Sequence, residues 1–95
     1  MSIKTFAHKG LREVFETGKS KKIGAGYLKR IEIILSALDG ATALGDLRNA
    51  HGFHALKGGR AGEYAVRVSG NMRITFRFEQ GDTGDIIDAD FEDYH

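Results

Sequence analysis

Residues 64–78 read YAVRVSGNMRITFRF, and this stretch decides the fold. Apolar residues alternate with polar or small ones on both sides of residues 69–71, a Ser-Gly-Asn sequence with hairpin-turn chemistry. This period of two predicts two antiparallel strands, because successive side chains of a strand point to opposite faces. One face should receive Ile74, Phe76 and Phe78. The opposite face should display Arg67, Arg73, Thr75 and Arg77, and we seek a function there.

Two further segments have the pattern of strands. Residues 87–92 alternate Ile, Ala and Phe with Asp and Glu, after a glycine-rich turn at residues 80–85. We expect Ile87, Ala89 and Phe91 to share one face of this last strand. The opening segment, residues 3–6, reads Ile-Lys-Thr-Phe and is a short candidate strand.

Helical spacing precedes the strands. Apolar side chains recur at helical intervals within residues 8–17 and 27–38, and Gly18 and Gly40 are suitable stops. Residues 41–47 can add a short helical turn. Helices followed by consecutive antiparallel strands predict an α+β domain. Two N-terminal helices should pack on one face of a mostly antiparallel sheet of about four to five strands.

Length and composition limit the remaining possibilities. Ninety-five residues form one domain, residues 1–95. The chain has no cysteine, which excludes disulfides, thiolate metal sites and thiol nucleophiles. Its first ten residues lack a signal-peptide core, and no apolar stretch approaches the length of a membrane span, so we expect a cytoplasmic protein without membrane contact.

Charge is distributed unevenly along the sequence. Residues 1–80 contain 14 basic and 7 acidic side chains, whereas residues 81–95 contain 6 acidic and no basic ones. A basic body suits a polyanion or an acidic protein partner. The alternative is that lysines such as those at positions 19, 21 and 22 only solvate a loop.

Several motifs do not support a specific chemistry. His51 and His54 have a metal-ligand spacing, but they lie in a probable loop without a third ligand nearby, so we expect no metal or cofactor. Residues 57–62 are rich in glycine but lack the residue order of a phosphate-binding loop, and a turn between strands explains them better. The serines show no acyl-transfer motif.

The remaining polar groups suit RNA cleavage without a metal. Such a reaction needs a base for the 2′-hydroxyl, cations for the phosphorane and an acid for the leaving 5′-oxygen. Histidine can take either proton-transfer role, arginine and lysine bind phosphate, and tyrosine can stack on a base. The candidates reachable from the polar face are His54, Lys57, Asn71, Arg73, Asp93, Tyr94 and His95.

Each candidate also has a purely structural explanation. His54 can cap a strand, and Lys57 can be a solvated lysine at the sheet edge. Arg73 can pair with Glu63 or Glu79 across the sheet, a contact of small value at a surface. Tyr94 can close the core, and a terminal His95 can be idle. Composition and spacing alone therefore support a nucleic-acid-binding hypothesis and no more.

Four segments, taken together, closely resemble the HigB branch of the RelE-like toxins. They contain L-K-G-x-R-x-G at residues 56–62, N-x-R-I-T-F at residues 71–76 and D-Y-H at residues 93–95, with a similar N-terminal segment at residues 3–11. The likeness spans essentially the whole chain. It implies a RelE-like fold and a type II toxin, an endoribonuclease that cleaves mRNA in the ribosomal A site. It also implies a HigA-like helix-turn-helix antitoxin, with operator DNA bound only through the antitoxin complex.

The resemblance assigns roles residue by residue. His54, Arg73, Asp93, Tyr94 and His95 would form the catalytic set, with Arg73 on the phosphate and His95 in proton transfer. Lys57 and Asn71 would contact RNA, and Arg67 and Arg77, which strand alternation displays on the polar face, are further candidates for RNA binding.

This chain departs from the family pattern at two places. Met72 stands where an aromatic residue is usual, and the hairpin over residues 79–88 is longer and more acidic than expected, near the end that would face RNA. Two rival interpretations stay open. One is a ParE-like toxin that inhibits gyrase by binding, and the other is an inactive module that binds only antitoxin or ribosome.

Overall fold

The hairpin predicted from residues 64–78 forms as expected in the computed structural model, which describes residues 2–41, 44–47, 52–81 and 83–93. Strand β2 (Glu63–Ser69) pairs antiparallel with β3 (Met72–Phe78). Between them Gly70 adopts a φ of 57°, a left-handed conformation that glycine reaches without strain. The period of two therefore identified both strands correctly.

Two more strands complete a four-stranded antiparallel sheet in the order β1-β2-β3-β4. Strand β1 (His54–Ala55) is short, and a 3-10 turn, η3 (Gly58–Arg60), connects it to β2. Strand β4 (Ile86–Asp93) pairs with β3. The segment predicted as an opening strand makes only two isolated parallel bridges to β4, from Ile3 and Phe6.

Both predicted helices are present. Helix α1 (Lys9–Thr17) begins where the His8 Nδ1 accepts hydrogen bonds from the backbone N–H groups of Gly10 and Leu11, at 2.9 and 3.3 Å. Helix α2 (Leu28–Gly40) follows the 3-10 turn η1 (Ala25–Tyr27). A further 3-10 turn, η2 (Leu44–Leu47), matches part of the helical turn expected there; residues 42 and 43 lie outside the described ones.

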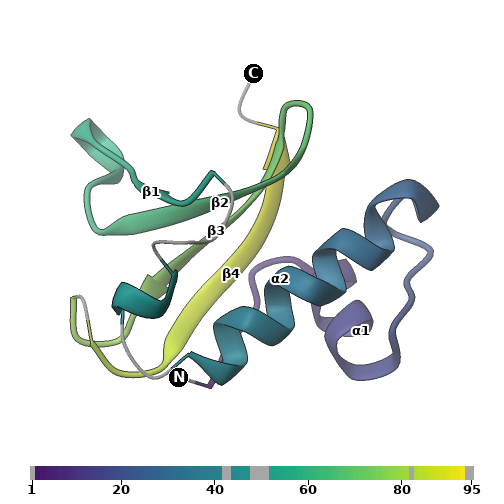
Figure 1. Cartoon of the computed structure of the whole chain (residues 1–95), viewed down its shortest axis with the longest axis horizontal. Helices are drawn as coiled ribbons and strands as arrows, with labels where there is room; N and C mark the ends of the chain where they lie inside the picture. Colours follow the sequence, from purple (N-terminus) through teal and green to yellow (C-terminus); the bar gives the residue numbers. More distant parts are fainter. Residues whose placement is uncertain (1, 42–43, 48–51, 82, 94–95) are drawn as a thin grey trace.

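Helices and sheet form two layers (Figure 1), with α1 and α2 on the same side of the sheet. The apolar face of α2 buries Ile31, Ile34, Leu35 and Leu38, as the spacing predicted. These side chains join Ile74, Phe76 and Phe78 in one core cluster. The prediction of two N-terminal helices is wrong for α2, which ends near the middle of the chain. The α+β class and the antiparallel sheet are confirmed.

A β-bulge changes the face pattern of β4. The β3–β4 register shifts between Thr75 and Arg77, and Asp88 adopts a positive φ of 56°. Ile87 consequently pairs with Arg77 on the polar face, whereas Ile86 is fully buried opposite Phe78. The expectation that Ile87 shares a face with Ala89 and Phe91 is therefore wrong, because the extra residue reverses the alternation.

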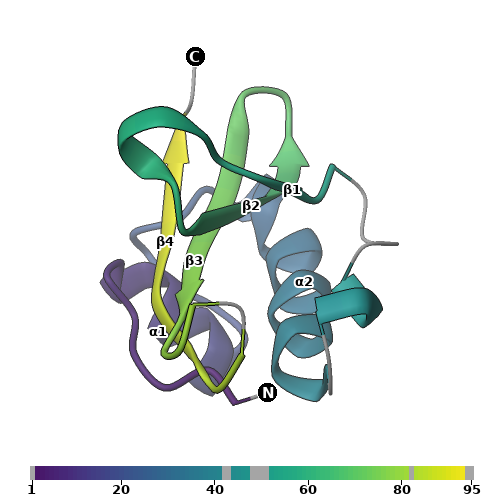
Figure 2. The same cartoon turned by 90° about the vertical axis from the view of Figure 1, so that its left-hand side faces the viewer.

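The long β3–β4 turn lies at the opposite end of the sheet from the β2–β3 turn (Figures 1 and 2). Its Glu79 accepts a hydrogen bond from the Lys4 Nζ at 2.9 Å, and the Asp85 side chain accepts one from the Ser2 backbone N–H. The longer hairpin therefore contacts the N-terminal segment, at the other end of the sheet from Asn71 in the β2–β3 turn. In the described part of the chain, neither helix is long and apolar enough to cross a membrane.

Candidate nucleic-acid interface

The sheet face turned away from the helices presents its side chains in three cross-strand rows, which we call the polar face. Cross-strand partners point to the same side, so the register defines each row. The first row contains Glu63, Arg77 and Ile87. The second contains His54, Ala65, Thr75 and Asp90, and the third contains Arg67, Arg73 and Glu92. The four residues predicted to share this face, Arg67, Arg73, Thr75 and Arg77, do share it.

The middle row differs from its neighbours in size and burial. Ala65 is fully buried and Thr75 is only 1% exposed, although both belong to the polar face. The prediction that Thr75 is displayed is therefore wrong, because the longer side chains around it cover its small hydroxyl. The accessible chemistry of this face comes from the long side chains.

Arg73 is held by an acidic partner that the sequence did not indicate. Its Nε and Nη2 both lie close to one oxygen of Glu92, Oε1, at 3.0 and 2.9 Å. The Arg73 side chain is only 12% exposed. Glu92 is its direct cross-strand partner, whereas the partners considered from sequence, Glu63 and Glu79, pair with other cations. The guanidinium of Arg73 is therefore oriented by β4.

Arg60 extends this contact into a network of four charges. Its Nη1 donates to the same Glu92 oxygen at 2.7 Å. Its Nε and Nη2 donate to the two oxygens of Glu63 at 3.0 and 2.8 Å, a bidentate pair. These hydrogen bonds lower the pKa of Glu63 and raise the pKa of Arg60. Sequence reasoning noted Arg60 and Glu92 within segments of the chain but gave neither residue a role.

Three further cations are more accessible than Arg73. Arg67 and Arg77 are exposed, as is Lys57 in the link between β1 and η3. Among the residues that the structure describes, none of these three has an ion-pair partner within 4 Å. Exposed guanidinium and ammonium groups of this kind can meet phosphate oxygens directly.

The His54 ring is oriented by its own loop. Its Nδ1 lies 2.9 Å from the Gly52 carbonyl oxygen. A carbonyl oxygen only accepts, so Nδ1 is the donor, and in the neutral ring Nε2 keeps a lone pair. Since His54 is exposed on the polar face opposite Ala65, this lone pair suits proton abstraction from a bound molecule.

The structure does not bring every candidate onto the polar face. Asp93 pairs with Met72 at the end of β4, and strand alternation places it on the opposite side from Glu92 and Arg73. Asn71 is exposed in the β2–β3 turn. Tyr94 and His95 lie outside the described residues, as does His51. Within the described ranges, no three His, Asp or Glu side chains gather as metal ligands would.

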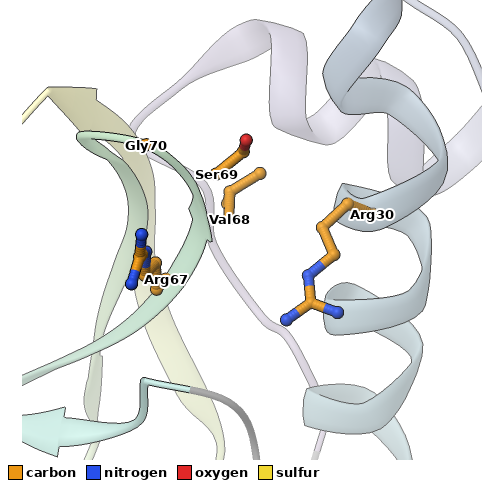
Figure 3. Close-up of a pocket in the computed structure, with 5 residues that line it drawn as sticks. All are labelled: Arg30, Arg67, Val68, Ser69 and Gly70. Carbon is orange, nitrogen blue, oxygen red and sulfur yellow. The ribbon is translucent and has the colours of Figure 1, made fainter.

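A pocket of about 410 Å³ lies between α2 and the β2–β3 hairpin, lined by Arg30, Arg67, Val68, Ser69 and Gly70 (Figure 3). Arg30 extends from α2 toward the sheet, whereas the Arg67 guanidinium lies on the other side of the β2 ribbon from Val68. The two guanidinium groups therefore do not converge, and of the residues that line this pocket Arg67 alone belongs to the polar face.

These features define a small α+β protein whose sheet face presents exposed arginines that can meet the phosphate groups of a polyanion. Comparison with known proteins gives the family. The chain matches, over residues 4–95, the family described as the RelE-like toxin of the type II toxin–antitoxin system HigB, and it belongs to that family. It is also 43% identical over 94 residues to the Endoribonuclease HigB of Proteus vulgaris, with 98% of this chain and 99% of that protein covered.

Proposed function

We propose that this chain is a ribosome-dependent endoribonuclease that cleaves mRNA in the A site and so inhibits translation. The observation that supports this most is the polar face, where an oriented Arg73 lies among exposed cations and shares the sheet surface with His54. A relative covering nearly the whole chain is named an endoribonuclease. The residues and the relative thus point to the same chemistry.

The proposed reaction is metal-independent attack by the ribose 2′-hydroxyl. The bond from O2′ to phosphorus forms, the bond from phosphorus to O5′ breaks, and the products are a 2′,3′-cyclic phosphate and a 5′-hydroxyl. A base takes the 2′ proton and an acid returns one to O5′. His54 suits the base, because its Nε2 lone pair is set by the Gly52 contact. Arg73 would stabilise the charge on the phosphorane.

The remaining roles come from the resemblance, except those of Arg67 and Arg77, which come from their position on the polar face. We propose that Asp93, Tyr94 and His95 complete the site, with His95 as the partner in proton transfer and Tyr94 stacking on a base. Lys57, Asn71, Arg67 and Arg77 would contact RNA, three of them through charges that are exposed in the structure. Because His54 and the contacting cations are so exposed, the ribosome would have to hold the RNA in reactive geometry.

The biological setting follows from the family. A type II toxin needs an antitoxin, and we propose a HigA-like helix-turn-helix protein that also carries the complex to operator DNA. Residues 1–95 would act as a single cytoplasmic domain with a RelE-like arrangement of helices on the sheet. The sheet order and the helix side described above are compatible with that arrangement.

The test is primer extension on one mRNA in two conditions, translated in an extract and free of ribosomes, each with and without the purified chain. We expect new 5′ ends within codons of the translated message and scarcely any cutting of the free RNA. Rapid cutting of free RNA would exclude ribosome dependence. An intact translated message would reject the nuclease, and a parallel gyrase supercoiling assay would then separate a gyrase inhibitor from an inactive binding module.

A further inference from the structure

We propose that Glu92 and Arg60 are positioning residues for the reaction, which act by fixing the guanidinium of Arg73. This inference rests on the proposed function, because it assigns Arg73 to the reacting phosphate. It adds two residues from different parts of the chain, one on η3 and one on β4, to the machinery of the polar face.

The Arg73–Glu92 contact fixes a plane as well as a distance. Nε and Nη2 form one edge of the guanidinium, and both meet the single oxygen Oε1 of Glu92. A guanidinium has five N–H donors in a rigid fork, so binding one edge sets the direction of all five. Preorganised donors stabilise a transition state without reorganising during the reaction. Glu92 therefore orients Arg73 before RNA arrives.

Arg60 in turn fixes Glu92. Its Nη1 donates to the same Oε1, so this oxygen accepts from two arginines at once. The other side of the Arg60 fork is clamped by both oxygens of Glu63 on β2. The four side chains are partly shielded, with exposures of 40% for Arg60, 22% for Glu63, 12% for Arg73 and 25% for Glu92. Coupled, partly shielded charges hold a geometry better than an isolated surface pair does.

Because the network pairs positive with negative charges, it can position the Arg73 guanidinium without a large free-energy cost. Within these contacts, the positive charges of Arg60 and Arg73 are matched by the negative charges of Glu63 and Glu92. Removing the charge of Glu92 would leave two guanidinium groups facing each other around one neutral side chain. Their repulsion would turn Arg73 away from its oriented position. The loss of this orientation should therefore slow the chemical step and lower kcat.

The first experiment measures cleavage of ribosome-bound mRNA by Glu92→Gln and Arg60→Lys at saturating and limiting substrate. Glu92→Gln keeps an acceptor oxygen but loses the charge, and Arg60→Lys keeps the charge but loses the fork. We expect kcat to fall about 10–100-fold with KM within about threefold, a smaller loss than the removal of a transition-state donor outright. The conservative Glu92→Asp should restore part of the rate. Thermal melts confirm that each variant is folded.

A matched control is Glu79→Gln. Glu79 pairs with Lys4 at 2.9 Å, the same kind of contact at the other end of the sheet, and should change kcat less than twofold. The decisive variant combines Glu92→Gln with Arg73→Ala. If Glu92 acts only through Arg73, the double variant cleaves no more slowly than Arg73→Ala alone. A loss that multiplies, or wild-type kcat in Glu92→Gln, overturns the positioning role while the nuclease assignment stands. A wild-type chain that does not cleave rejects the proposed function itself.

Discussion

Arg67 and Arg73 face each other across β2 and β3, yet their surroundings differ completely. They are direct cross-strand partners in the same row of the polar face. Arg73 is 12% exposed and bound by Glu92, whereas Arg67 is exposed and has no ion-pair partner among the described residues. Arginine therefore serves two purposes on the polar face. An oriented arginine suits transition-state stabilisation, and an exposed one suits attraction of the phosphate backbone.

We expect the largest effect from the loss of His95, the proposed proton-transfer partner in the reaction at Arg73. We expect His95→Ala to reduce cleavage about ten- to ten-thousand-fold, the span associated with a positioned acid–base group. The measurement is the single-turnover rate on ribosome-bound mRNA. Unchanged cleavage would remove His95 from the site and leave His54 as the histidine to examine.

The next effect tests the two arginines directly. Arg73→Ala should lower the single-turnover rate about 10²–10³-fold, the usual cost of removing a transition-state donor. Arg67→Ala, its matched control in the same row, should change the rate at saturating substrate by less than about threefold. Equal losses in the two variants would show that orientation by Glu92 makes no difference.

A stability measurement extends the comparison to the paired and unpaired cations. Arg60→Met should lower the free energy of unfolding by about 1 kcal/mol at pH 7, because it leaves Glu63 without its partner; the estimate is kept small since Arg60 is 40% exposed. Arg67→Met should stay within about 0.5 kcal/mol of the wild type. Chemical denaturation measures both, and similar values for the two variants would contradict the structural distinction.

The same network predicts a dependence on pH. Arg60 lowers the pKa of Glu63 below its ordinary value of 4.5 in the folded chain. The stabilisation is therefore fully present above pH about 4.5 and is lost as the pH falls through the lowered pKa. Denaturation curves of the wild type and Arg60→Met should converge in that acid range. A difference that persists undiminished at lower pH would mean that Glu63 is not the titrating group.

The smallest effect should be seen in RNA binding. Arg67→Ala should reduce the salt dependence of single-stranded RNA binding by about 0.7 in the slope of log K against log salt, the value for one phosphate contact. Arg77→Ala should do the same if both exposed arginines meet phosphates. An unchanged slope in both variants would place the RNA path elsewhere.

The sequence predicted much of this fold because its patterns are local. The period of two in β2 and β3 and the helical stripe of α2 each depend on neighbouring residues, and the structure confirms them. The membership of Arg67, Arg73 and Arg77 in one face follows from the same alternation. These predictions needed no knowledge of distant contacts.

The sequence predictions were wrong where contacts between residues far apart in the sequence determine the structure. The bulge at Asp88 moved Ile87 to the other face of the sheet. Nothing in the alternation of residues 87–92 indicates an extra residue. Glu92 became the partner of Arg73 only through the register of β4 against β3. Arg60 reaches the same carboxylate from a turn 32 residues earlier. Through Glu92, the acidic C-terminal segment and the basic body, separate in sequence, thus meet in one ion-pair network.

We have proposed that the polar face around Arg73 cleaves RNA through the neighbouring 2′-hydroxyl. The most direct measurement is the chemical end of the upstream fragment from a ribosome programmed with a defined A-site codon. We expect a 2′,3′-cyclic phosphate, absent when that hydroxyl is methylated and formed at least about a hundredfold more slowly by Arg73→Ala. A 3′-hydroxyl end, or cleavage of the methylated codon at the normal rate, would contradict it.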